Sequence, residues 1–103
     1  MLVKVDFPAF IGAMTAKAKK DVRYYLEGVF IDPRGYLVAT DGHRLFCAAV
    51  AEGAGPFIIR VIGKAPTKFD HAVFDTDDLC VGFFKDDESP LGNLPISLIG
   101  GVS

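Results

Sequence analysis

The sequence predicts a single α+β domain in which one helix packs on an antiparallel sheet. Its 103 residues suffice for one domain, and 50% of them are hydrophobic, so the chain can fill one core. Apolar residues recur with a helical period in residues 8–19, but with a period of two from residue 25 onward. We therefore expect one helix near the N-terminus and strands through the rest of the chain.

The helix is predicted over residues 8–19, after a short strand at residues 2–5. Asp6 is suited to cap the helix, and Pro8 fits its first turn, where a missing backbone N–H is tolerated. The residues expected to face the sheet are Phe10, Ile11, Met14 and Ala18.

The strands that follow are separated by turn sequences. Asp32-Pro33-Arg34-Gly35, Asp41-Gly42 and Asp77-Asp78 are typical of tight turns. The tail contains Pro90, Gly92 and Pro95 before the last predicted strand. Strands are predicted at residues 25–31, 36–40, 44–50, 57–62, 71–75, 79–84 and 96–99. The glycines and prolines near residues 53–66 oppose a second helix, so none is expected after residue 50.

Charge and cysteine content exclude several classes of protein. With 11 basic and 13 acidic residues, the net charge of -2 excludes a uniformly basic nucleic-acid coat but allows a local basic patch. Such a patch lies in KAKKDVR, residues 17–23. Cys47 and Cys80 lie in apolar stretches, typical of reduced cysteines in a strand or core. With no run of about 18 apolar residues and no secretory pattern, we expect a cytoplasmic protein without membrane contact.

The basic patch is followed by two tyrosines, and this combination is typical of nucleic-acid contact. Tyr24 and Tyr25 can rest on sugar or bases while the neighbouring cations meet phosphates. In the alternative, one tyrosine is buried and the other covers the end of the helix.

Catalysis is disfavoured by the residues themselves. Asp41 and His43 could act as an acid and a base, but no serine or cysteine nucleophile stands at a supporting spacing. His43 and His71 form no metal-ligand spacing, and Gly53-x-Gly55 leads into a proline rather than a phosphate-binding helix. We therefore expect no catalytic residue, no metal and no cofactor.

Two motifs carry a resemblance to a known family. RYYL at Arg23–Leu26 and VATDGHRL at Val38–Leu45 stand in a stretch, Lys20 to Leu45, that closely resembles the middle domain of the bacterial sliding clamp, the β subunit of DNA polymerase III. The resemblance implies DNA-facing roles for Lys20, Arg23, Tyr24 and Tyr25, to which charge alone adds Lys17 and Lys19. It also implies a pocket for short peptides of polymerases and repair proteins, formed by Leu26, Thr40, Gly42, His43, Arg44 and Leu45. We expect this pocket as a shallow groove away from the basic helix end.

The chain departs from the family pattern in two respects. A clamp chain has three domains, the next of which supplies the other wall of the pocket, and each domain has a second helix. Residues 1–50 carry the resemblance, so residues 1–103 are interpreted as one shortened clamp domain whose second helix is missing.

The expected function is that of a non-enzymatic clamp-like DNA-replication protein. It would bind duplex DNA weakly and form a homo-oligomer, with about six copies in a closed head-to-tail ring. One alternative is a stand-alone peptide-binding module that competes for clamp partners without encircling DNA. Another is a degenerate fragment that persists as a small folded dimer.

Overall fold

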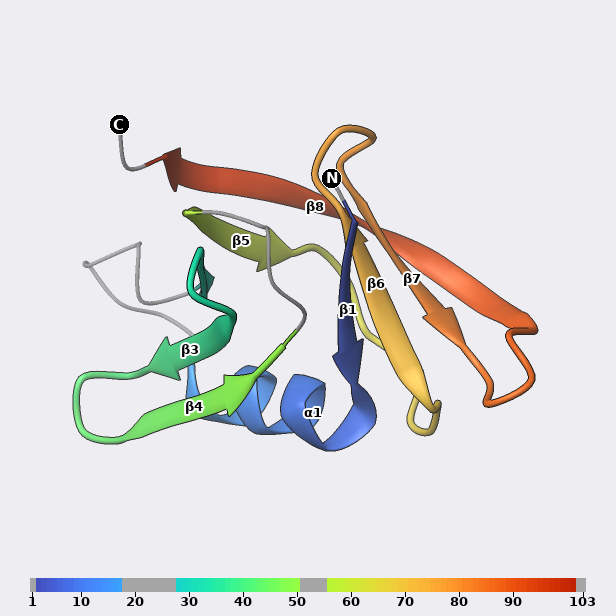
Figure 1. Cartoon of the computed structure of the whole chain (residues 1–103), viewed down its shortest axis with the longest axis horizontal. Helices are drawn as coiled ribbons and strands as arrows, with labels where there is room; N and C mark the ends of the chain where they lie inside the picture. Colours follow the sequence, from blue (N-terminus) through green and yellow to red (C-terminus); the bar gives the residue numbers. More distant parts are fainter. Residues whose placement is uncertain (1, 18–27, 51–55, 102–103) are drawn as a thin grey trace.

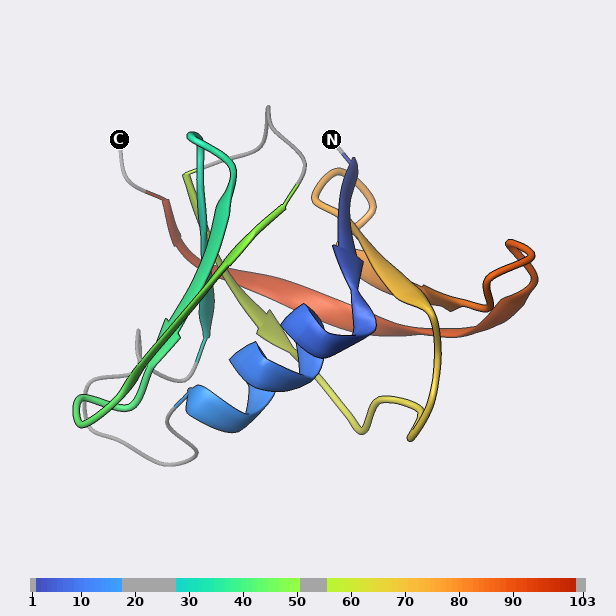
Figure 2. The ribbon, with the colours of Figure 1, turned by 60° about the horizontal axis from the view of Figure 1, so that its bottom comes forward.

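The computed structural model describes residues 2–17, 28–50 and 56–101 (Figure 1). One helix and eight strands follow in the order β1 (Leu2–Asp6), α1 (Phe7–Ala16), β2 (Val29–Asp32), β3 (Tyr36–Thr40), β4 (Leu45–Ala49), β5 (Phe57–Val61), β6 (His71–Asp75), β7 (Cys80–Phe84) and β8 (Pro90–Gly101). The strands form one antiparallel sheet in the order β1-β6-β7-β8-β5-β2-β3-β4. The prediction of one helix packed on an antiparallel sheet is therefore confirmed, with the sheet curled so that α1 lies on its concave side (Figure 2).

The strand order contains an internal repeat that no repeat in the sequence indicates. The first half of the chain supplies β1, a connection and then β2 to β4. The second half supplies β5, a connection and then β6 to β8. The first strand of each half pairs with the second strand of the other half, as β1 with β6 and β5 with β2. In the first half the connection contains α1, whereas residues 62–70 connect β5 to β6 without a helix. Gly63 has a φ of 109° and Pro66 lacks a backbone donor, both of which oppose a helix in this connection.

The start of α1 agrees with the sequence pattern. The Ala9 N–H donates to the Asp6 carboxylate at 2.9 Å, and Pro8 lies in the first turn. The predicted end at residue 19 is wrong, because Lys17 has an extended backbone and its N–H donates to the Ala13 carbonyl at 3.1 Å.

The predicted packing face of α1 is also only partly correct. The helix buries Ala9, Phe10, Ala13 and Ala16. Ile11 is 37% exposed and Met14 is half-buried, whereas Ala18 lies outside the described residues. Alanine side chains allow α1 to approach β3 and β4 closely, so the small residues rather than Ile11 form the contact face.

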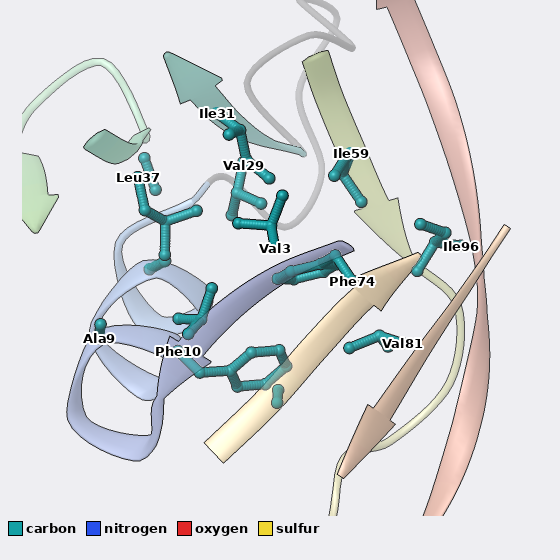
Figure 3. Packing of buried hydrophobic residues seen from close by; sticks show 14 of the residues in the cluster. Val3, Ala9, Phe10, Val29, Ile31, Leu37, Ile59, Phe74, Val81 and Ile96 are labelled. Carbon is teal, nitrogen blue, oxygen red and sulfur yellow. The ribbon is translucent and has the colours of Figure 1, made fainter. Parts of the chain in front are cut away.

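Phe10 lies at the centre of the core. Its ring is within 5.4 Å of the rings of Phe69 and Phe83, edge to face, and 6.0 Å from that of Phe74. Figure 3 shows side chains from the helix and from strands of both halves directed toward one another. The core therefore depends on both halves of the chain at once.

Local turn sequences predict the hairpins correctly. At the turn between β2 and β3, the Gly35 N–H donates to the Asp32 carbonyl at 2.9 Å, and Gly35 has a φ of 96°. Asp32 also accepts from the Arg34 backbone at 2.8 Å and from its guanidinium at 2.9 Å.

The strand predicted at residues 96–99 is much longer than expected. β8 begins at Pro90 and crosses the molecule (Figure 1). Its first part pairs with β7 as far as Pro95, and its second part pairs with β5 from Ile96 onward. Pro90 is the first residue of the strand, and Pro95 lies where the strand changes its partner, with its carbonyl accepting from the Ile62 N–H at 2.9 Å. A missing backbone N–H is tolerated at such positions. This explains why Pro90 and Pro95 do not break the strand.

The remaining differences are small. The strand predicted from residue 25 begins, within the described residues, at Val29. Cys47 and Cys80 are free and lie in strands, but Cys47 is exposed and neither belongs to the core. In the described ranges, no helix has the length and apolar character needed to cross a membrane.

Candidate functional site

The residues predicted to face DNA lie almost entirely outside the described residues. These are Lys19, Lys20, Arg23, Tyr24 and Tyr25, and the same holds for Leu26 of the predicted pocket. Lys17 is described: it is half-buried at the C-terminal end of α1. A basic residue is favourable there, because the helix dipole places partial negative charge at this end.

The other residues of the predicted pocket form one rigid turn between β3 and β4. The Thr40 hydroxyl donates to the Arg44 carbonyl at 2.6 Å and accepts from the Gly42 N–H at 3.0 Å. The Asp41 carboxylate accepts from the His43 and Arg44 N–H groups at 2.9 and 3.0 Å. Gly42 has a φ of 94°, a conformation that favours glycine. The TDGHR sequence therefore fixes its own turn through side chain to backbone hydrogen bonds.

These hydrogen bonds also favour the charged form of the Asp41 carboxylate. The His43 N–H, the Arg44 N–H and the positive charge of Arg44 lower the pKa of Asp41, while its partial burial opposes this. The Arg44 guanidinium lies 3.3 Å from the Asp41 carboxylate. Asp41 is thus occupied as the acceptor of the turn, an arrangement that serves structure rather than proton transfer.

Arg44 joins the turn to the helix. Its guanidinium donates to the Thr15 carbonyl at 2.8 Å, in the last turn of α1. This carbonyl is one of the helix-end acceptors that lack a partner within the helix. Arg44 thus lies against the C-terminal end of α1 at Thr15, two residues before Lys17, whereas the groove was predicted on the surface away from the basic helix end.

Among the described residues, Leu45 is an exposed apolar side chain of the turn. It is 70% exposed at the start of β4, and the next residue, Phe46, packs inward against α1. A Cβ at Gly12 would overlap the Phe46 ring, so helix and strand are in direct contact there. The turn thus presents Leu45 as an exposed apolar side chain on a rigid support. A second surface would be needed to enclose a peptide.

Sequence reasoning missed a hollow between α1 and the connection from β5 to β6. It has a volume of about 480 Å³. Its lining includes Ile11 and Met14 of α1, Val61 of β5, and Ala65 and Pro66 of the connection. The signal in the sequence is the pair Ile11 and Met14, which the helical period assigns to the face on the sheet but which line this hollow. We call this hollow the helix groove.

The sequence pattern also did not predict that His71 is buried and held by charged partners. His71 is 2% exposed at the start of β6, and its ring stacks on that of Phe84 at 5.4 Å. Its Nδ1 lies 2.8 Å from the Asp70 carboxylate and its Nε2 3.3 Å from that of Glu88. Glu88 adopts a φ of 68°, unusual for a residue other than glycine. Both ring nitrogens therefore have partners, which accounts for the burial of this side chain.

Within residues 2–17, 28–50 and 56–101, no three histidine, cysteine, aspartate or glutamate side chains are grouped so that they could hold a metal ion. Comparison with models of protein families, with curated proteins and with solved structures finds no match to this chain.

Proposed function

We propose that the protein is a clamp-like, non-enzymatic DNA-replication protein that acts as a homo-oligomer on duplex DNA and on replication partners. The observation that carries the proposal is the sequence VATDGHRL at Val38–Leu45, together with RYYL at Arg23–Leu26. The turn built by the first motif joins the basic helix end to an exposed leucine. A DNA-facing patch and a partner-binding surface would then be adjacent on one small domain.

The internal repeat supports the interpretation as a shortened clamp domain. The two halves share the pairing of their last three strands and the exchange of their first strands, although β8 pairs with β5 whereas β4 and β1 are sheet edges. Only the first half contains a helix between its first two strands. The position of the helix that a clamp domain would have in its latter half corresponds to residues 62–70. Loss of that helix leaves the sheet intact, because β5 to β8 retain their pairing.

Two open sheet edges support the homo-oligomer. β1 and β4 are the outermost strands of the sheet, and β4 directs Leu45, Cys47 and Ala49 outward. An exposed edge that carries apolar side chains and no charge is prone to pair with another chain. If β4 of one copy meets an edge of the next, the contact is head-to-tail and can close into a ring.

Native mass and DNA binding test the proposal together. We expect a stable oligomer and duplex binding that is independent of sequence and weakened steeply by salt, with a log-log slope of about -0.9 per phosphate contact. A variant with alanine at Lys19, Lys20 and Arg23 together should no longer bind duplex DNA. The matched control places three alanines at Lys4, Lys68 and Lys85, which lie elsewhere on the chain. A monomer that binds no duplex at low salt, or binding unchanged in the first variant, overturns the proposal.

A second candidate is the stand-alone peptide-binding module, favoured by the exposure of Leu45 on a rigid turn. An extended peptide with a glutamine and a Leu-Phe end should then shift the backbone amides of residues 40–45. With half of the enclosing surface missing, we expect a Kd between about 50 µM and 1 mM. Leu45→Asp should remove the shifts, whereas Leu79→Asp, on the distant turn between β6 and β7, should not. Shifts at other residues, or none at millimolar peptide, contradict this function.

A further inference from the structure

The helix groove is an apolar recess for which the fold itself suggests an occupant. One wall is the side of α1 that carries Ile11, Met14 and Lys17, above the buried Phe10. The other wall is the connection after β5, residues 63–67, with Val61 at its base. A volume of about 480 Å³ lies within the range of about 300–1,000 Å³ typical of binding sites.

The chemistry of the lining is apolar with a basic rim. Ile11, Met14, Val61, Ala65 and Pro66 supply hydrocarbon surface. Among the described residues of the lining, the charged ones are two lysines, Lys17 and Lys64, and Lys64 is exposed. A ligand that fits this surface has an apolar face and carries negative charge beside it.

The internal repeat indicates that this ligand is a helix. The connection from β1 to β2 places α1 against the sheet, whereas the equivalent connection from β5 to β6 contains no helix. The helix groove lies between α1 and this helix-free connection. A helix that lay there would pack beside α1 in the place that the repeat leaves without one.

We propose that the helix groove binds an amphipathic helix of a partner protein, with its apolar face on Ile11 and Met14 and acidic residues beside Lys17 and Lys64. Helix-in-groove recognition requires apolar anchors at positions i, i+3, i+4 and i+7, which can follow the side of α1. The groove is too apolar for a phosphate backbone to be the preferred occupant, because nucleic acid is bound chiefly through cations and exposed aromatic rings. This inference goes beyond the proposed function, since it involves neither the RYYL segment nor Leu45.

Two designed peptides and four variants of the full chain test the proposal. The acidic probe is a peptide of about 15 residues with leucines at i, i+3, i+4 and i+7 and glutamates beside them, and the basic probe replaces each glutamate with lysine. Ile11→Glu and Lys64→Glu change the groove at exposed positions. Leu2→Glu and Lys4→Glu make the same substitutions on β1, outside the groove. Backbone amide shifts report the site, and thermal unfolding confirms that each variant folds.

We expect the acidic probe to shift amides in residues 10–17 and 61–67, with a Kd near 100 µM–1 mM. Ile11→Glu should weaken binding by about tenfold or more, through the loss of a central apolar anchor. Lys64→Glu should weaken binding of the acidic probe by roughly threefold and strengthen binding of the basic probe, because the charge at the rim of the groove is reversed. The two β1 variants should bind like the native chain.

Four outcomes would overturn the proposal. Equal binding of both probes, or shifts outside residues 10–17 and 61–67, would show that this surface does not recognise an acidic helix. A dimer in light scattering that Ile11→Glu converts to a monomer would mean that a second copy fills the groove. Displacement of the acidic probe by duplex DNA, with shifts at the same amides, would assign the groove to nucleic acid. Because the duplex test above uses residues 19–23, failure of either proposal is distinguishable from failure of the other.

Discussion

Replacement of Gly12 by alanine tests the contact that holds the β3–β4 hairpin on the helix. Gly12 lies in the middle of α1, and a Cβ at this position would overlap the Phe46 ring. Two effects of opposite sign therefore compete. Alanine stabilises the helix by about 1 kcal/mol relative to glycine. Overpacking against a ring in a formed core costs roughly 1–3 kcal/mol.

Because Phe46 is only half-buried, its ring can move outward at some cost in free energy. We expect this cost to lie within the range of roughly 1–3 kcal/mol given for overpacking. Gly12→Ala should then lower the free energy of unfolding by about 0–2 kcal/mol, despite the gain in helix propensity. A Phe46→Leu background removes the two nearest ring atoms, Cε1 and Cζ, and so relieves most of the overlap. The same substitution should then raise the free energy of unfolding by up to about 1 kcal/mol. The sign of the effect thus depends on the residue across the interface.

Urea unfolding of the native chain, both single variants and the double variant measures this as a double-mutant cycle. A coupling free energy of about 1 kcal/mol or more between the two positions is expected. The matched control is Ala13→Gly, which should destabilise the helix in both backgrounds alike. If Gly12→Ala stabilises the native chain as much as it stabilises the Phe46→Leu variant, β4 does not lie on α1 at this point and the position assigned to the Leu45 turn is refuted.

Three further predictions concern the core and the two turns. Phe10→Ala should lower the free energy of unfolding by about 3–5 kcal/mol in urea unfolding, because a fully buried ring is lost from an aromatic cluster; a change below about 1 kcal/mol would contradict the core assignment. Arg44→Met should lower it by about 1 kcal/mol through loss of the hydrogen bond to the Thr15 carbonyl, and should speed amide exchange in residues 42–45. The hydrogen bonds from Arg34 hold the pKa of Asp32 at about 2 rather than 3.8, so the contribution of Asp32 to stability is present above pH 3.8 and is lost as the pH falls toward 2. Carboxyl titration by NMR should show this midpoint in the native chain and a rise toward 3.8 in Arg34→Ala; an unchanged midpoint would refute the pairing.

The features that sequence reasoning predicted correctly are those with local causes. Asp32 and Gly35, like Asp41 and Gly42, satisfy their turns through hydrogen bonds across two or three residues. The cap of α1 at Asp6 is equally local. Such patterns need no knowledge of the rest of the fold, so both hairpin turns and the helix start lie where they were expected.

The errors arise where distant segments decide the outcome. Ile11 was assigned to the core because it is apolar, but the small residues of α1 meet β3 and β4 and leave Ile11 beside a hollow. The last strand was predicted only after Pro90 and Pro95, because nothing local reveals that β8 begins at Pro90 and changes its pairing partner at residue 96. The site shares this limit: the hydrogen bonds within the TDGHR turn follow from its sequence, whereas its attachment to Thr15 depends on tertiary packing.

The exchange of first strands between the two halves has a consequence for how the chain folds. β1 needs β6 as its partner, β2 needs β5, and β8 joins β7 to β5. The hairpins β2-β3-β4 and β6-β7-β8 pair within their own halves. Neither half can pair its first strand before the other half is present, so the contacts that complete the sheet are distant in sequence. Topologies of this kind fold slowly, in milliseconds to seconds, because long loops must close before their contacts form. On the ribosome, the N-terminal strand must wait for residues 71–75. The β1-β6-β7 part of the sheet is joined to the β5-β2-β3-β4 part only after residues 90–101 have emerged.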